Sequence, residues 1–431
     1  MPPRRLVISF LAASTMIVGG CVFLDVKEQQ ASLDAACLIS GSVTSARPNP
    51  GPTVVVLFRQ ADDGTTGPGS WKVVDHFVME QPGRWGFGTT GPGRYAVAAF
   101  EDRSRDLVYQ PGEAYGTLGL DQPLTCGSGT RFNDLALAIP EKVRDPFPAS
   151  LDVVKLQARS LEGQLNATLG QLTATGELAS LSDARFSEAN AENGLWRPFD
   201  FLLTSRAGVY FLEPYDPGRI PVLFVHGING TPASFEYLIE RLDRSKFQAW
   251  VYYYPSGVHL GTIAEHLDQT MAKLKLRHGF RRFAVVAHSM GGLVSRGFIQ
   301  RHANAAVDDM PLFVTLSTPW GGHKSAELGV KRAPVVVHVW RDMAPGSDYQ
   351  KSLYVAPLPA SLQHHLVFTF NRKSGSFGES DDQSVTVASQ LLPQAQRDAA
   401  KIYGFDDTHT GVLRDPQVSL LINQLLAERL R

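Results

Sequence analysis

One segment constrains the fold more than any other: an apolar run that ends at a serine between small residues. Phe283-Ala-Val-Val-Ala287 has the composition of a buried strand, and Leu293–His302 has the pattern of a helix. Ser289 stands between them, with Ala287 two positions before it and Gly291 two positions after it. Small residues at these positions avoid clashes in a tight turn. The pattern predicts a strand–turn–helix unit that presents the Ser289 hydroxyl above a sheet, beside the positive end of a helix.

The C-terminal half of the chain alternates strand-like and helix-like runs. Apolar runs that fit strands are 209–212, 221–226, 249–254, 283–287, 312–317 and 366–370. Between them, residues 232–242 and 263–274 carry apolar side chains at helical spacing. Continuous apolar strands that alternate with amphipathic helices predict a mostly parallel sheet with helices on both faces. The expected fold class is therefore α/β.

A second strand end adds a glycine-rich loop. The segment Pro221-Val-Leu-Phe-Val-His-Gly-Ile-Asn-Gly230 is an apolar strand that runs into a His-Gly loop and then into a helix. Here the chain resembles the α/β-hydrolase superfamily, in particular bacterial lipases and esterases, over more than half of its length. The resemblance implies that the backbone N–H groups of Ile228 and Met290 form an oxyanion hole. His226 and His288 are interpreted as structural residues rather than proton carriers.

The same resemblance places two further residues later in the chain, because the family order is serine, acid, histidine. The segment Ser380-Asp-Asp-Gln-Ser-Val385 resembles the family's acid turn. Counting back three residues from the end of that segment selects Asp382, and Asp381 stays open as the alternative. The sequence around His409, before the last predicted helix, resembles the histidine loop. The resemblance thus implies Ser289 as nucleophile, His409 as base and Asp382 as the orienting acid.

This set of residues predicts a serine hydrolase that cleaves carboxylic esters through an acyl-enzyme intermediate. The same triad serves thioesters and amides, so a thioesterase or amidase is an alternative, as is a non-catalytic lipoprotein that binds envelope material. Residues 324–362 lie where lipases carry a lid or an acyl-binding cap, and whether the segment moves stays open. The chemistry needs neither a metal ion nor a cofactor, so none is expected. With 41 Lys+Arg against 42 Asp+Glu, nucleic acid is not an expected partner; the oligomeric state is left open.

The first 20 residues have the layout of an export signal. Arg4 and Arg5 precede an apolar stretch over 6–18, which is too short to span a membrane. The following Val18-Gly-Gly-Cys21 resembles the lipobox of bacterial lipoproteins, in which the cysteine is lipidated and becomes the N-terminus. That resemblance implies a protein held on a membrane of the bacterial cell envelope by lipid on Cys21, on the periplasmic or outer-membrane side. The alternative is an ordinary signal peptide with an incidental cysteine.

Two further cysteines bear on the N-terminal half. With Cys21 lipidated, Cys37 and Cys126 remain, and an even pair in an exported chain predicts a disulfide, two free thiols being the alternative. They flank most of residues 37–140, where short apolar runs alternate with turn residues as in a β-sandwich domain. Within this domain, Gly93–Asp102 resembles transthyretin-like or carboxypeptidase-regulatory-like modules, for which we expect a binding or spacer role.

The remaining segments complete the expected domain organisation. Residues 1–20 form the signal peptide, and residues 21–36 are interpreted as a tether. Residues 141–195 carry leucines at helical spacing among charged and polar residues, which predicts a helical linker. The α/β-hydrolase domain is expected to cover residues 196–431.

Overall fold

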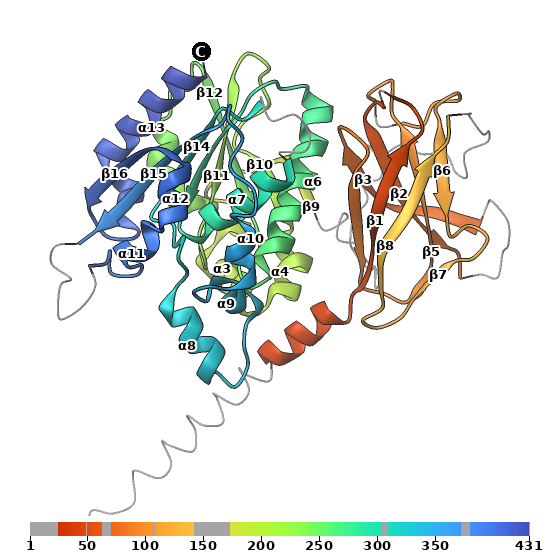
Figure 1. Cartoon of the computed structure of the whole chain (residues 1–431), viewed down its shortest axis with the longest axis horizontal. Helices are drawn as coiled ribbons and strands as arrows, with labels where there is room; N and C mark the ends of the chain where they lie inside the picture. The colour runs from red at the N-terminus through yellow and green to blue at the C-terminus, as the bar shows by residue number, and fades with distance from the viewer. Residues whose placement is uncertain are drawn as a thin grey trace, which may run out of the picture.

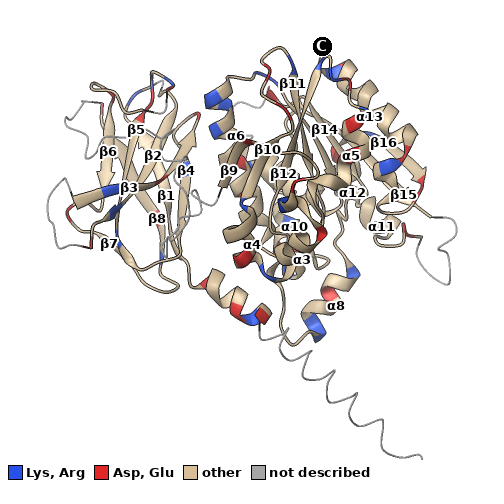
Figure 2. Ribbon diagram, turned by 180° about the vertical axis from the view of Figure 1, so that it is seen from behind, with Lys and Arg blue, Asp and Glu red and all other residues tan. Residues whose placement is uncertain are grey.

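The chain forms a β-sheet body beside a larger body in which helices surround a sheet (Figure 1). The structure is a computed structural model, and it describes residues 25–48, 50–62, 70–106, 108–141, 173–302, 309–371 and 380–430. Within these ranges no helix has the length and apolar character needed to cross a bilayer. Basic and acidic residues occur in both bodies (Figure 2), and their totals in the sequence are nearly equal.

The smaller body consists of two β-sheets packed face to face. One sheet has the order β4-β1-β8 and contains β1 (Cys37–Ser45), β4 (Arg84–Thr89) and β8 (Arg131–Ile139). The other has the order β3-β2-β5-β6, with β7 on β5, and contains β2 (Thr53–Gln60), β3 (Trp71–Met79), β5 (Gly93–Glu101), β6 (Tyr115–Leu118) and β7 (Leu124–Cys126). Ile39, Val55 and Val97 belong to the apolar cluster between the sheets. Alternate residues of each strand enter this core, which produces the β-sandwich expected from the sequence.

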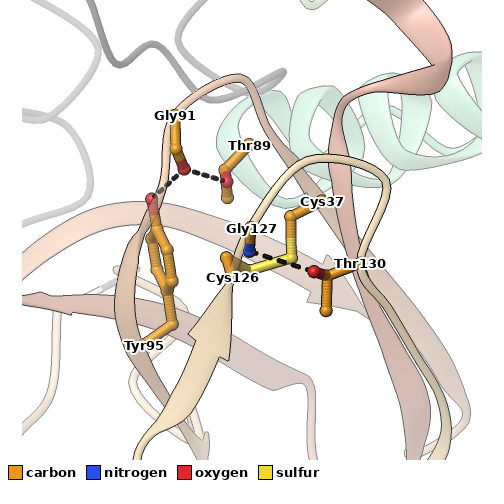
Figure 3. The surroundings of a disulfide bond; sticks show 7 residues. All are labelled: Cys37, Thr89, Gly91, Tyr95, Cys126, Gly127 and Thr130. Atoms are coloured by element: carbon orange, nitrogen blue, oxygen red, sulfur yellow. Dashed lines mark hydrogen bonds between the residues drawn. A yellow bond between two sulfur atoms is a disulfide. The ribbon is translucent and has the colours of Figure 1, made fainter.

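A disulfide joins Cys37 at the start of β1 to Cys126 at the end of β7 (Figure 3). Both residues are buried, and 89 positions separate them in the sequence. Beside the bridge, the hydroxyls of Thr89 and Tyr95 both donate hydrogen bonds to the carbonyl of Gly91. A crosslink over a loop of this length stabilises a fold by about 4.5 kcal/mol in the chain-entropy account.

The larger body is built on an eight-stranded sheet of order β16-β15-β14-β13-β11-β12-β10-β9. Its strands are β9 (Thr173–Leu178), β10 (Ala207–Phe211), β11 (Ile220–Val225), β12 (Phe247–Tyr253), β13 (Ala284–His288), β14 (Leu312–Leu316), β15 (Gln363–Phe370) and β16 (Ala399–Asp406). The six strands from β11 to β16 are parallel, and β10 pairs antiparallel with β12. The carboxyl ends of these six strands therefore meet at one edge of the sheet.

Helices cover both faces of this sheet. They are α3 (Glu188–Trp196), α4 (Pro198–Ser205), α5 (Glu236–Glu240), α6 (Leu260–His278), α7 (Met290–His302), α8 (Lys324–Arg332), α9 (His338–Met343), α10 (Asp348–Ser352), α11 (Val387–Gln390), α12 (Pro393–Asp398) and α13 (Pro416–Arg429). Val285 and Ala287 pack in one core with α6 and α7, whereas Ala284 and Val286 pack in a second core with α5 and α13. The α/β fold class predicted from the sequence is confirmed.

The predicted helical linker differs from the structure at its C-terminal end. Thr173–Leu178 forms strand β9, which pairs in parallel with β10 at the edge of the large sheet, and α3 follows it. The sheet therefore begins before residue 196. An edge strand is covered on fewer sides than a central one, so its six residues, Thr-Ala-Thr-Gly-Glu-Leu, lack the apolar run that reveals the other strands. The helix predicted from leucines between 151 and 172 lies outside the described residues.

The expected tether also differs from the structure. Residues 25–34 form a helix, drawn in red in Figure 1, that packs against the larger body. Val26 is buried in the core that contains α6 and α7. The side-chain carbonyl of Gln29 accepts a hydrogen bond from the backbone N–H of Asp200, and the side-chain amide of Gln30 donates one to a backbone carbonyl after α8. Cys21 and the predicted signal peptide lie outside the described residues.

Candidate active site

Ser289 occupies the sharp turn between β13 and α7. Its φ of 53° lies in the left-handed region, and its backbone N–H donates a 2.8 Å hydrogen bond to the carbonyl of Leu316 at the end of β14. The turn leaves no space for side chains at the two glycines that follow. A Cβ on Gly291 would lie 2.3 Å from a backbone oxygen of β11, and one on Gly292 would lie 2.1 Å from the hydroxyl of Thr318. These close contacts explain the small residues after the serine.

Three loops at the carboxyl edge of the sheet bring together a serine, a histidine and an aspartate. His409 lies after β16, and its Nε2 is 2.8 Å from Oγ of Ser289. Its Nδ1 is 2.8 Å from Oδ2 of Asp382, which lies after β15. With the serine hydroxyl donating to Nε2 and Nδ1–H donating to the carboxylate, this geometry allows proton transfer from the serine to the imidazole.

Asp382 is fully buried, and donors surround its carboxylate. Oδ1 accepts hydrogen bonds from the backbone N–H groups of Ser384, at 3.0 Å, and Val385, at 2.7 Å. Oδ2 also accepts from the hydroxyl of Thr369, at 2.7 Å, and from the side-chain amide of Gln390, at 3.1 Å. Burial by itself would raise the pKa of Asp382, but these donors and His409 outweigh it and hold the pKa below its ordinary value. The group is therefore a carboxylate at neutral pH.

The neighbouring Asp381 faces a different set of atoms. Its Oδ1 accepts a hydrogen bond from the backbone N–H of Gln383, and its backbone pairs with Thr386 in an isolated bridge. Of the two aspartates left open by the sequence, Asp382 is thus the one whose carboxylate contacts the imidazole.

Sequence reasoning did not identify Gln390 as part of this site. The residue ends α11, and its side-chain amide bonds the backbone N–H and carbonyl of Thr369 as well as the carboxylate of Asp382. It therefore fixes both the strand that precedes the acid turn and the acid itself. A single glutamine in the mostly apolar segment 385–392 gives no sequence signal for this role, because the role depends on contacts made only after folding.

The glycine-rich loop after β11 lies against the serine. A Cβ on Gly227 would be 2.8 Å from Cβ of Ser289, so the loop approaches the turn as closely as a glycine permits. Ile228, the next residue, lines the same cleft as Ser289, and Met290 follows the serine as the buried first residue of α7. The backbone N–H of Asn229 donates a hydrogen bond to the hydroxyl of Ser256, which follows β12, and this bond fixes the glycine-rich loop. Ile228 thus lines the cleft that contains Ser289, and Met290 directly follows Ser289 in the chain.

His226 and His288 both have structural contacts. Nδ1 of His226 lies 2.8 Å from the carbonyl of Gly227, and its ring stacks on Tyr254 with centroids 4.2 Å apart. Nε2 of His288 lies 2.8 Å from the backbone carbonyl of His409, and this bond ties the histidine loop to the serine turn. Burial lowers the pKa of His226 to about 4, and burial together with nearby His409 lowers that of His288 to about 3. Both rings are neutral at pH 7.

These histidines make the fold sensitive to mild acid. Burial also lowers the pKa of His364 to about 3. Below about pH 6.5 the unfolded chain takes up protons at His226, His288 and His364, whereas the folded chain does not until pH 4 or lower, so stability falls with pH in that window. Each of the three histidines then lowers the free energy of unfolding by roughly 2 kcal/mol between pH 7 and pH 5. We expect the unfolding temperature to fall by at least about 10 °C over this range in calorimetry.

The variant His364→Asn provides the matched comparison for this pH dependence. Whatever its stability at pH 7, it has one buried titrating group fewer and is expected to lose less stability between pH 7 and pH 5. Carboxylates titrate below this window and do not enter the difference. An unfolding temperature of the wild-type protein that stays constant or rises from pH 7 to pH 5 would contradict the account.

Ser289 and His409 line a cleft of about 700 Å³. Met343 at the end of α9 reaches the same cleft, so the segment 324–362 contributes to its wall. Val339 and Leu353 of that segment are buried in the core with α6 and α7, which shows that the segment packs on the domain.

One family model matches part of the larger body. The model of the alpha/beta hydrolase fold matches residues 220–346, from β11 to just after α9, and this body therefore has the α/β-hydrolase fold. No curated protein matches the chain in sequence.

Solved structures with some similarity include two lipases and a thioesterase domain. The mature lipase BlEst2 of Bacillus licheniformis is 20% identical with a TM-score of 0.40, and the match covers 51% of this chain and 97% of the lipase. Lipase B of Aspergillus fumigatus is 15% identical with a TM-score of 0.40, and the match covers 51% of this chain and 55% of the lipase. The Vlm2 thioesterase domain is 15% identical with a TM-score of 0.34, and the match covers 52% of this chain and 97% of that domain.

Proposed function

We propose that the protein is a serine hydrolase that cleaves carboxylic esters through an acyl-enzyme intermediate. The observation that carries the proposal is the continuous hydrogen-bonded chain from Ser289 through His409 to Asp382, with the first two residues at the wall of a 700 Å³ cleft. A serine alone is a weak nucleophile, and a positioned base with an orienting acid is what activates it.

In the proposed reaction Oγ of Ser289 attacks the ester carbonyl while Nε2 of His409 takes the hydroxyl proton. The tetrahedral intermediate collapses, the carbon–oxygen bond to the alcohol breaks, and His409 returns the proton to the departing alkoxide. Water then attacks the acyl-serine with His409 again as base, which releases the carboxylic acid and restores the serine. Asp382 keeps the imidazole in the tautomer with a proton on Nδ1 and stabilises the imidazolium.

The backbone N–H groups of Ile228 and Met290 are assigned to the oxyanion of the tetrahedral intermediate. The assignment is supported by Ile228 lining the same cleft as Ser289 and by Met290 following Ser289 at the positive end of α7. A donor of this kind stabilises the developing charge by about 3 to 4 kcal/mol in comparable sites.

A set of p-nitrophenyl esters from acetate to palmitate tests the proposed activity. We expect turnover of at least part of the series, and the chain length with the highest kcat/KM defines the acyl preference. The matched thioesters and anilides test the thioesterase and amidase alternatives, which use the same triad. Absence of hydrolysis across all three series, by protein that is folded, would favour the non-catalytic binding alternative.

We further propose that lipid on Cys21 attaches the protein to a membrane of the bacterial cell envelope. The proposal rests on the lipobox-like sequence before the cysteine. Residues 22–24 alone separate Cys21 from the helix over 25–34 that packs on the larger body, and such a spacer spans at most about 14 Å. An anchored protein would thus lie close to the bilayer.

The variant Cys21→Ser tests the anchor in the expressing cell. We expect the wild-type protein in the membrane fraction with the mass of a lipidated chain that begins at Cys21. The variant should leave that fraction or keep an uncleaved signal, and its mass should lack the lipid. A wild-type chain without added lipid mass would contradict the proposal.

A further inference from the structure

We propose that the cleft selects esters that carry a negatively charged group, a carboxylate or a phosphate, and that Arg414 binds this group. The inference rests on the proposed function of the site, because it names the substrate class of the same cleft. It depends on where Arg414 is held, on which charges surround it, and on the shape of the space beside Ser289.

Arg414 is held at a fixed place relative to the catalytic histidine. It is the last residue of the short helix Gly411–Arg414, five positions after His409, and its side chain lines the cleft that contains Ser289. Val412 and Leu413 of the same turn are buried, which anchors the turn to the domain. The backbone of Arg414 is therefore held at the edge of the cleft by a turn that is anchored in the domain, rather than by a long, unsupported loop.

The fixed charge among the residues that line the cleft is of one sign, positive. Among the described residues that line it, none is an aspartate or glutamate, and Arg414 is the one lysine or arginine. The carboxylate of Asp415, next in the chain, instead accepts hydrogen bonds from the N–H groups of Gln417 and Val418 at the start of α13. The carboxylate of Asp407 accepts one from the N–H of Thr408.

Arg414 is exposed, and within the described part of the chain its guanidinium forms no ion pair. A guanidinium is charged at every physiological pH and binds carboxylates and phosphates with two parallel hydrogen bonds. An unpaired guanidinium beside a cleft whose described lining has no carboxylate attracts an anion.

A second hollow offers space for the apolar part of such a substrate. It has a volume of about 430 Å³ and shares His323 and Ser384 with the cleft. Pro345, Val385 and Leu392 give it apolar surface. An ester bound at Ser289 can thus extend its hydrocarbon chain into this hollow while its charged group lies at Arg414.

Two pairs of substrates test the preference, each with a charged member and a neutral member. The first pair is 3-octanoyloxy-4-nitrobenzoate and its methyl ester, which share the acyl group and the scissile bond. The second pair is dioctanoyl phosphatidylglycerol and dioctanoylglycerol in mixed micelles. For the wild-type protein we expect kcat/KM to be about tenfold higher for the charged member of at least one pair at low salt, and the preference to shrink at high salt.

The variant Arg414→Gln should remove that preference. We expect it to lower kcat/KM for the charged substrate by about tenfold, chiefly through a higher KM, with a much smaller loss for the neutral member, and Arg414→Lys should restore part of the effect. The matched control Arg84→Gln removes the same charge from β4 of the other body and should leave both members unchanged.

A selective effect on the carboxylate pair or on the phosphate pair supports the proposal and assigns the anion. Hydrolysis of neutral esters without any charge preference, or equal losses on both members in Arg414→Gln, overturns the proposal and leaves the proposed function intact. No hydrolysis of any of the four substrates by folded wild-type protein overturns this proposal, and it overturns the proposed function as well only if the p-nitrophenyl esters, thioesters and anilides are also left uncleaved.

Discussion

Replacement of Ser289 by alanine is expected to abolish ester turnover while the fold stays intact, with kcat lower by roughly 10⁴- to 10⁶-fold. The hydroxyl is the group whose oxygen lies 2.8 Å from Nε2 of His409, and no other nucleophile contacts that nitrogen among the described residues. Alanine keeps the small volume that the turn requires. Turnover of a p-nitrophenyl ester by the purified variant, with its unfolding temperature measured alongside, gives the result.

Ser295→Ala is the matched control for this substitution. Ser295 lies on α7, six residues after Ser289, and is fully buried, but its hydroxyl donates to the carbonyl of Gly291 within the helix. Its loss is expected to change kcat by less than a few fold. A Ser289→Ala variant that keeps more than a few per cent of the wild-type activity would show that another residue performs the attack.

Asp382→Asn is expected to lower kcat by up to about 10⁴-fold, whereas Asp381→Asn should lower it by less than about tenfold. An asparagine at 382 can present its NH₂ group to Nδ1 of His409, which favours the tautomer with no free lone pair on Nε2 for the serine proton. It also removes the negative charge that stabilises the imidazolium. The carboxylate of Asp381 accepts a hydrogen bond from the backbone N–H of Gln383 instead, so its charge contributes less to stabilising the imidazolium of His409.

Steady-state kinetics on both variants, each with a thermal unfolding curve, decides between the two aspartates. The substitution at 381 is the natural control, because it makes the same chemical change one residue away. The opposite ranking, with both proteins folded, would assign the orienting role to Asp381.

The parts of this site that could be predicted from sequence are those with short-range patterns. The turn at Ser289 needs a strand, small neighbours and a helix, all within a few residues, and the acid turn and the histidine loop resemble known local motifs. The choice of Asp382 over Asp381 depended on counting within one turn, and the contact with His409 agrees with that choice.

Other features could not be predicted, because they depend on contacts between distant segments. Gln390 bonds Asp382 and Thr369 from a different loop, and nothing in its own neighbourhood indicates this. The helix over 25–34 buries Val26 in the core of the larger body, but its three apolar residues, Val26, Ala31 and Leu33, are too little apolar sequence to reveal that contact. Strand β9 is likewise defined by its pairing with β10 rather than by its own composition.

The central claim is that Ser289 is an activated nucleophile, and covalent labelling tests it most directly. The folded wild-type protein is treated with a fluorophosphonate probe, digested, and examined by mass spectrometry to locate the phosphonylated residue. The account predicts a single modified residue, Ser289, with labelling that a substrate ester slows and that His409→Ala greatly reduces. Labelling at another residue with Ser289 unmodified, or no labelling of a preparation that hydrolyses esters, would contradict it.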